Sequence, residues 1–163
     1  MNPDASLIKF NKAEFLSGKQ IIALETAKDH YHADAAVVWC FDDRFSSALS
    51  VFLETKQIKR KDLVCIAGGL KTLASPDNEN DRTFVLGQIL ASIALHHTPT
   101  VYLMVHSDCG KYGGLQTFGN DENAELRHYQ LEAKRAVDFL TANLEASIKI
   151  EPVFVDFTGV WKI

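Results

Sequence analysis

Four short apolar segments, each rich in β-branched and aromatic residues, alternate along the chain with stretches of helical periodicity. The segments are AAVVWCF at 35–41, DLVCIAGG at 62–69, PTVYLMV at 99–105 and PVFVDF at 152–157. Short apolar runs of this kind are typical of strands that are buried on both faces, and strands that alternate with helices imply a mostly parallel sheet. We therefore expect an α/β fold, with a single domain over residues 1–163 and a mostly parallel central β-sheet covered by helices on both faces.

Apolar residues at helical spacing predict the helices between these strands. The stretch 44–58 is amphipathic, the stretch 84–94 is typical of a buried helix, and the stretch 126–144 predicts a long one. The polar segment 1–32 also has helical character, so we expect an N-terminal helical segment there. In contrast, SPDNENDR at 75–82 is rich in turn formers and predicts a loop.

The composition limits the classes of partner. The chain has 163 residues, 47% of them apolar and 23% charged, which suits one domain with one sizeable core. Its formal net charge is −4, and its short basic run, KRK at 59–61, is typical of a solvated helix end. We therefore expect no nucleic-acid partner.

The longest apolar window, at 84–106, is interrupted by Gln88, by two histidines and by Pro99, so it does not predict a membrane-spanning helix of about 20 apolar residues. We expect no membrane partner. The first residues lack the cationic start and apolar region of a secretory signal, so we expect a cytoplasmic protein. The three cysteines form an odd number, which favours metal binding or catalysis over a disulfide framework.

Metal-binding side chains follow two of the predicted strands. Cys40, Asp42 and Arg44 follow the first strand, and His106 and Cys109 follow the third. In an open parallel sheet the ligand-binding crevice lies outside the carboxyl ends of the strands, and crossover helices can bring these two strands side by side. Two cysteines and one histidine are ligands typical of zinc, and an open fourth tetrahedral position is typical of a catalytic site. We predict a zinc site at Cys40, His106 and Cys109.

The spacing of Asp42 and Arg44 suits a supporting role beside such a metal. Two thiolates and a neutral imidazole cancel the charge of the zinc ion, so zinc acidifies a bound water less strongly than it does with three histidines. A carboxylate at Asp42 can organise the resulting hydroxide, but an unpaired carboxylate can also bind the zinc and block the site. Arg44, two residues away on the same side of an extended chain, can hold that carboxylate through two parallel hydrogen bonds.

These residues form two motifs, C-x-D-x-R at 40–44 and H-x-x-C-G at 106–110, each placed after a predicted strand. In this order and context they resemble the β-class carbonic anhydrases, and the short length is similar to the compact bacterial and archaeal branch of that family. The Ala-Gly turn within IAGG at 66–69 and the ending PVFVDFTGVW at 152–161 are also similar to the family. The resemblance covers roughly residues 20–163.

The resemblance implies one zinc ion per chain, held by Cys40, His106 and Cys109, and an enzyme that converts carbon dioxide reversibly to bicarbonate and a proton. In the family's scheme zinc supplies the hydroxide, Asp42 orients it and accepts its hydrogen bond, and Arg44 restrains Asp42. The substrate is thus a small molecule, carbon dioxide or bicarbonate. The resemblance also implies a homodimer or a multiple of dimers.

Two departures from the family pattern leave other functions open. Asp43 stands where the family usually has serine, and this extra anion can compete for Arg44 or raise the pKa of bound water. Cys65 and Ile66 stand where the family usually has an Arg-Asn pair. One alternative is therefore a carbonic-anhydrase-like zinc protein without catalytic activity. Another is a zinc hydrolase of a different small linear substrate, such as carbon disulfide.

Each motif also has a purely structural interpretation. Cys40 and Cys109 can be buried, inert cysteines. Asp42 and Arg44 can be a surface ion pair at a helix start, and Asp43 is more typical of an N-terminal helix acid than of a catalytic group.

The same holds for other polar residues. Asp108 is expected to cap a turn, His96 and His97 to lie at a helix end, and Cys65 to be a small core residue. GKYGG at 110–114 lacks the residue pattern of a phosphate-binding loop and predicts a tight turn that lets Cys109 reach the metal.

Overall fold

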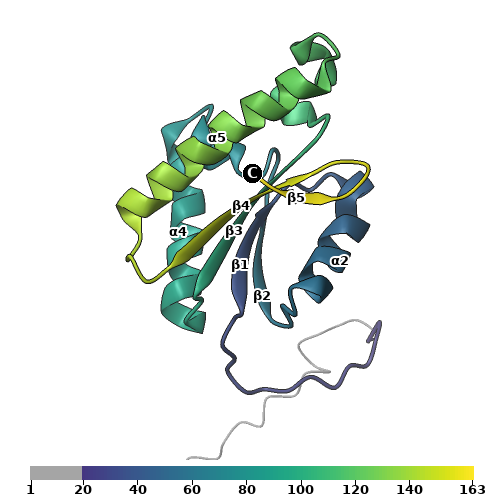
Figure 1. Ribbon diagram of the computed structural model, residues 1–163. Helices are drawn as coiled ribbons and strands as arrows, with labels where there is room; N and C mark the ends of the chain where they lie inside the picture. The colour runs from purple at the N-terminus through teal and green to yellow at the C-terminus, as the bar shows by residue number, and fades with distance from the viewer. Residues whose placement is uncertain (1–19) are drawn as a thin grey trace, which may run out of the picture.

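Five strands form one sheet in the order β2-β1-β3-β4-β5, and helices lie on both of its faces (Figure 1). The computed structural model describes residues 20–163. The strands are β1 (Ala35–Trp39), β2 (Lys61–Cys65), β3 (Thr100–His106), β4 (Lys149–Val155) and β5 (Val160–Lys162). The α-helices are α2 (Ser46–Thr55), α3 (Lys71–Ala74), α4 (Glu79–His96) and α5 (Glu122–Asn143), and the 3₁₀ helices are η1 (Asp43–Phe45), η2 (Gly110–Tyr112) and η3 (Leu115–Phe118).

The predicted α/β architecture with a mostly parallel sheet is confirmed. Strand β1 pairs in parallel with β2 on one side and with β3 on the other, β3 pairs in parallel with β4, and only β5 runs antiparallel to its neighbour β4. The chain thus continues from β1 to β2 on one side of β1 and later returns to form β3 on its other side. The carboxyl ends of β1 and β3 therefore lie side by side at the point where the strand order reverses, which is where sheets of this type bind ligands.

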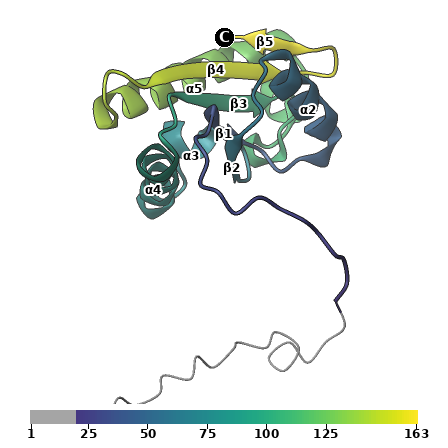
Figure 2. The same ribbon diagram turned by 90° about the horizontal axis from the view of Figure 1, so that it is seen from below.

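Two apolar layers cover the sheet, and successive residues of β1 point alternately into them. Ala36 and Val38 belong to the cluster formed with α3, α4 and α5, whereas Ala35, Val37 and Trp39 belong to the cluster formed with α2. All five residues are buried, which explains why β1 is a continuous apolar run. Figure 2 shows α2 and α4 on opposite sides of the sheet.

The N-terminal helix predicted up to His32 is wrong for residues 20–32, which form neither helix nor strand; residues 1–19 lie outside the described part of the chain. The apolar side chains of Ile21, Ile22 and Leu24 are exposed, and this segment extends away from the sheet in Figure 2. A short helix in water is marginal unless an apolar face packs against something, and here that face contacts no core.

Helix α4 begins at Glu79, so the loop predicted at 75–82 is wrong for its last four residues. The Asn78 side chain accepts a hydrogen bond from the Asn80 amide and caps the helix, and two acidic residues occupy the first turn. These polar residues are turn formers that also start helices well. The helix is not buried all round either, because Phe84 and Leu90 are exposed.

Two further differences concern the ends of the predicted elements. The long helix begins at Glu122, four residues before the first apolar residue of its stripe, and the short strand β5 was not predicted. Strand β5 has three residues and an intermediate-to-exposed pattern, so it carries too little apolar periodicity to be recognised. Within residues 20–163, every helix is too short or too polar to cross a membrane.

Candidate metal centre

The predicted metal-binding residues meet where β1 and β3 end. Cys40 follows β1 directly, His106 is the last residue of β3, and Cys109 lies three residues further on. Each of the three offers one ligand atom, and these atoms all lie within 4.8 Å of one another. All three residues are buried. The parallel pairing of β1 with β3 accounts for the convergence, because it places the two strand ends next to each other.

A residue in the left-handed conformation allows the end of β3 and the turn after it to supply two of the three candidate ligand atoms. Asp108 has a φ of 52°, a conformation that is uncommon for residues other than glycine and is favoured by Asp and Asn. It reverses the chain between His106 and Cys109, and 3₁₀ helix η2 follows at once. The predicted tight turn at GKYGG is confirmed by Gly113, which has a φ of 88°.

The two sulfurs share a proton, which lowers the pKa of one thiol and raises the pKa of the other. Hydrogen bonding from Cys109 lowers the pKa of the Cys40 thiol against the opposing effect of burial, and the hydrogen bond from the Gly68 amide lowers it further. The Gly68 N–H lies 3.3 Å from the Cys40 Sγ. The same sharing raises the pKa of Cys109. A thiolate is therefore already favoured at the centre, and the thiolate is the metal-binding form.

His106 presents a free nitrogen to the two sulfurs. Its Nδ1 lies 2.8 Å from the Ser107 carbonyl oxygen. Because a carbonyl only accepts, Nδ1 carries a hydrogen, so in the neutral, metal-binding form of the ring Nε2 carries the lone pair. Nε2 is buried and has no hydrogen-bond partner among the described residues. A buried nitrogen without a partner is costly, and a backbone bond to the other ring nitrogen is typical of metal-binding histidines. The arrangement therefore fits a metal ion.

Asp42 and Arg44 form the predicted pair beside this cluster. The Arg44 Nε donates to both carboxylate oxygens of Asp42, at 3.0 and 3.1 Å, and its Nη2 donates to Oδ2 at 2.7 Å. The Asp42 Oδ2 lies 3.9 Å from the His106 Nε2. Hydrogen bonding from Arg44 outweighs burial and lowers the pKa of Asp42, so this carboxylate stays ionised and both of its oxygens are held by the guanidinium.

Asp108 completes the arrangement in a way that the sequence did not reveal. The Arg44 Nη1 donates to its Oδ2 at 2.9 Å and the Nη2 to its carbonyl oxygen at 3.0 Å. Its Oδ1 accepts from the Leu115 amide at 2.9 Å, which confirms the predicted turn-capping role. Arg44 thus joins the end of β1 to the turn after β3. Residues 64 positions apart leave no periodic signal of such a bond in the sequence.

The positions that depart from the family pattern lie away from this network. Asp43 is exposed and occupies the first turn of η1. None of the hydrogen bonds or ion pairs of residues 20–163 involves its side chain, so it does not compete for Arg44. Cys65 is exposed at the end of edge strand β2, so its predicted place in the core is wrong.

Two aromatic rings form a wall on one side of the cluster. The Phe45 ring lies 4.7 Å from the His106 ring, and the Phe157 ring lies 5.0 Å from the Phe45 ring, measured between centroids. Phe157 is held in the turn before β5 by its neighbour Asp156, whose carboxylate accepts bonds from Thr158 and from the Trp161 indole. The final segment TGVW thus supports the wall as well as closing the sheet.

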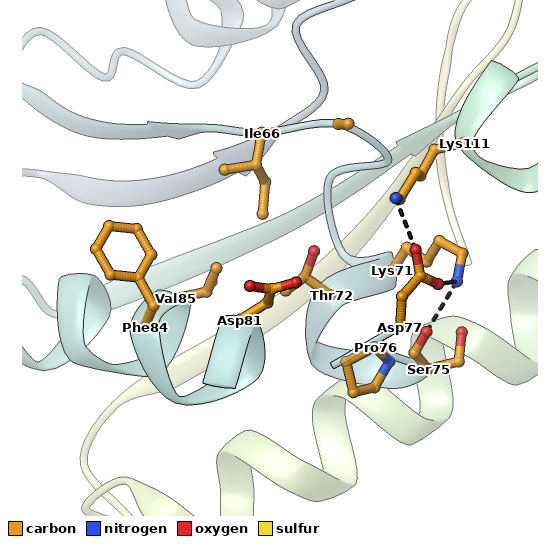
Figure 3. A pocket seen from close by; sticks show the side chains of 11 residues that line it. Ile66, Lys71, Thr72, Ser75, Pro76, Asp77, Asp81, Phe84, Val85 and Lys111 are labelled. Atoms are coloured by element: carbon orange, nitrogen blue, oxygen red, sulfur yellow. Dashed lines mark hydrogen bonds and ion pairs between the residues drawn. The ribbon is translucent and has the colours of Figure 1, made fainter. Parts of the chain in front are cut away.

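A pocket of about 220 Å³ lies beside the loop after β2 (Figure 3). Its two lysines, Lys71 and Lys111, both pair with Asp77, at 3.1 and 2.7 Å, and Figure 3 shows Asp77 close to both. The charges of these lysines are therefore compensated within the pocket. The stem of Lys111 packs against Gly68, where an added Cβ would lie 2.8 Å from it.

No family model matches the sequence, and no curated protein matches it. Solved structures do match. A β-carbonic anhydrase isoform I of Trichomonas vaginalis is 18% identical, with 93% of this chain and 90% of that chain covered and a TM-score of 0.56. The chain has the fold of the β-carbonic anhydrases. A carbonic anhydrase of Glaciozyma antarctica is 17% identical over 98% and 96% of the two chains, with a TM-score of 0.55.

Tetrameric β-carbonic anhydrases of Sordaria macrospora are also similar, with 16% identity, coverage of 82% and 81%, and a TM-score of 0.54. The β-carbonic anhydrase fold expected from the motifs is therefore confirmed. The assignment to a compact bacterial and archaeal branch stays a prediction.

Proposed function

We propose that the protein is a zinc-dependent carbonic anhydrase, which hydrates carbon dioxide reversibly to bicarbonate and a proton with one zinc ion per chain. The observation that carries the proposal is the buried, unpartnered Nε2 of His106, which faces two cysteine sulfurs beside a carboxylate held by arginine. The fold supports it, because solved structures that resemble this one include carbonic anhydrases.

Cys40, His106 and Cys109 are the residues that would hold the zinc ion. Zinc bound there supplies a Lewis acid that acidifies water at neutral pH. The chain's own contribution is to place an acceptor beside that water. Asp42 suits this role because its lowered pKa keeps it ionised. Arg44 prevents Asp42 from turning toward the metal by occupying both of its oxygens.

Arg44 is itself held against Asp108, on the turn between His106 and Cys109. A shift of the turn would therefore move Asp42 relative to the metal. The buried Phe45 ring covers one side of the His106 imidazole and excludes water there, which strengthens the electrostatic interactions there.

A second candidate function is a zinc protein that binds the metal for stability without turnover. The observation that favours it is the Cys65–Ile66 pair, which stands where the family usually has Arg-Asn; Ile66 lines the pocket beside the loop after β2. Such a protein would bind one zinc per chain and lose thermal stability with a chelator, yet it would show no hydration activity.

Stopped-flow hydration assays on zinc-loaded protein between pH 6 and 9 test the proposal. We expect a rate clearly above that of the buffer. Asp42→Ala should keep the zinc and lose most of the activity, whereas Cys40→Ser should lose both. A zinc-loaded wild-type protein with no rate above the buffer would reject the hydration reaction in favour of the second candidate.

We further propose that the chain assembles as a homodimer or a multiple of dimers. Large apolar side chains are exposed on edge strand β2 and on α4, namely Leu63, Phe84, Leu90 and Leu95. Exposed apolar patches of this kind commonly mark protein interfaces. Light scattering coupled to size-exclusion chromatography should give at least twice the mass of one chain, and a monomeric mass would refute the assembly.

A further inference from the structure

One buried carboxylate near the centre has no part in the roles described so far. Glu125 lies in the first turn of α5 and is 1% exposed. None of the ion pairs among residues 20–163 involves it. Its oxygens accept from the Ser107 hydroxyl at 2.8 Å, from the Asp108 amide at 2.7 Å and from the Tyr129 hydroxyl at 3.1 Å. A buried carboxylate is costly unless its hydrogen bonds are made, so these three donors hold it in place.

The position of Glu125 on the helix adds to this stabilisation. The start of α5 carries the positive end of the helix dipole, which favours an anion in the first turn. Asp121 caps the helix by accepting from the Asn123 amide at 2.8 Å, which fixes the direction of this turn. The carboxylate of Glu125 is thus a rigid acceptor presented by a long helix of 22 residues.

Two of its three donors belong to the residues between the proposed metal ligands. Ser107 and Asp108 are the only residues between His106 and Cys109. The Ser107 carbonyl sets the tautomer of His106, and Asp108 makes the left-handed reversal. A left-handed aspartate costs free energy and persists only where its surroundings determine it. Its amide is bonded to Glu125, while its carbonyl and both carboxylate oxygens are bonded to Arg44 and Leu115.

We propose that Glu125 is a positioning residue of the metal centre: from α5 it holds the turn at residues 107–108 in the conformation that brings the His106 Nε2 and the Cys109 Sγ to one point. The inference rests on the proposed metal-binding function. It differs from a general structural role because the same carboxylate bonds both residues of the turn. Through Asp108 it also supports the bond that joins the turn to Arg44.

The same helix offers a matched control. Glu132 lies seven residues after Glu125, is fully buried, and accepts bonds from Ser75, from Tyr112 at 3.3 Å and from Arg135 at 2.8 Å. It is as deeply buried and as well bonded as Glu125, but neither Ser107 nor Asp108 is among its partners. Loss of its side chain should therefore destabilise the fold without moving the two ligands.

The test measures Zn²⁺ affinity by competition with a chromophoric chelator and the absorption spectrum of the Co²⁺-loaded protein. We expect Glu125→Ala to weaken Zn²⁺ binding about 10- to 100-fold, the usual effect of losing a group that orients a metal ligand, and to alter the cobalt bands. Glu132→Ala should leave both unchanged. Glu125→Gln should restore both, because its amide oxygen still accepts from Asp108 and the Ser107 hydroxyl can turn to accept from its NH₂ group.

Far-UV circular dichroism of the metal-free variants checks that each one folds. If Glu125→Ala does not fold, Glu125→Asp replaces it: it keeps the charge but withdraws the carboxylate from the turn, so Zn²⁺ affinity should fall in the same direction. Equal Zn²⁺ affinities and cobalt spectra for wild type, the Glu125 variants and Glu132→Ala would overturn the positioning role and leave the metal centre standing. Equal losses for the variants at both positions would overturn it too. A wild-type protein that binds neither ion would instead refute the metal centre itself.

Discussion

The two ends of the sheet both bring a histidine next to an aspartate, but with opposite results. At the amino end, the Asp62 carboxylate accepts from Ser92 at 2.6 Å, from Tyr31 at 2.7 Å and from the His96 Nδ1 at 2.8 Å. At the carboxyl end, the His106 Nε2 is buried, has no hydrogen-bond partner within residues 20–163 and faces two sulfurs. Similar residue types therefore form a hydrogen-bonded joint at one end and the candidate metal centre at the other.

The joint at the amino end fastens the chain before β1 to the sheet. The Tyr31 ring packs on the His96 ring at 4.2 Å between centroids, and the Ala33 amide donates to the His96 carbonyl at 2.9 Å. Burial opposes ionisation of Asp62, but the hydrogen bonds from Ser92, His96 and Tyr31 outweigh it and lower its pKa. What distinguishes the candidate metal centre is therefore a buried histidine nitrogen without a hydrogen-bond partner among residues 20–163. The presence of histidine and aspartate alone does not mark a site.

The largest effect should come from removing a ligand at the carboxyl end. A ligand present at 1,000 times its Kd stabilises the folded state by about 4 kcal/mol, which is roughly 8 to 16 °C in Tm for a chain of this size. Wild type should show this rise in Tm on addition of zinc, and Cys109→Ser should lose it, as measured by differential scanning calorimetry. Asp62→Ala is the matched control and should keep the rise. An equal rise in Cys109→Ser would contradict the metal centre.

The second-largest effect should come from the replacement of Arg44. Arg44→Ala frees both Asp42 oxygens, so we expect the hydration rate to fall about 100-fold, within the range of a lost proton-handling group. The pKa of the Asp42 carboxyl, followed by carbon-detected NMR, should rise, because hydrogen bonding from Arg44 is the main cause of its low value. The control is Arg60→Ala, since Arg60 lies over the Tyr31 ring at the other end. A rate unchanged in Arg44→Ala would exclude the restraining role.

A smaller effect is expected at the amino end. Asp62→Ala leaves the donors of the joint without their acceptor, which should lower the free energy of unfolding by about 1–3 kcal/mol, as measured by urea denaturation at pH 7. Zn²⁺ affinity should not change. Any loss of Zn²⁺ affinity in this variant would show that the two ends of the sheet are coupled and do not act independently.

The lowered pKa of Asp62 also predicts how its contribution to stability depends on pH. Because the folded pKa of Asp62 is lowered, its contribution is fully present above the unfolded pKa of about 3.9 and is lost as the pH falls through the folded value. The stability difference between wild type and Asp62→Ala should thus be constant above about pH 5 and should shrink below about pH 4. Urea titrations from pH 3 to 7 measure this stability difference. A difference that grows as the pH falls would contradict the lowered pKa of Asp62.

The smallest effect is expected at Asp43. Its side chain is exposed and Arg44 is engaged by Asp42 and Asp108, so Asp43→Ser should change the barrier by no more than about 0.5 kcal/mol. That corresponds to a hydration rate within about twofold of wild type. A tenfold faster variant would show that this anion does hinder the centre.

Strand ends were the part of the site that could be predicted. Cys40 and His106 each follow an apolar run, and such runs identify buried strands without knowledge of the rest of the chain. The pairing of Asp42 with Arg44 was equally accessible, because side chains two residues apart share a side. The segment at 20–32 was mispredicted as a helix. A short helix is stable only where its apolar face packs against other residues, and the side chains of Ile21 and Leu24 are exposed instead.

By itself, the sequence determined the α/β class, the three candidate metal ligands and the carboxylate with its arginine, since all of these follow from local patterns. Only the tertiary structure decided that Arg44 donates to Asp108 and that Glu125 accepts from the turn. It also decided that the His106 Nε2 has no partner in the described part of the chain. These contacts join residues far apart in the chain. Hydrogen bonds between distant single residues create no periodicity, so they become visible only when the fold brings the residues together.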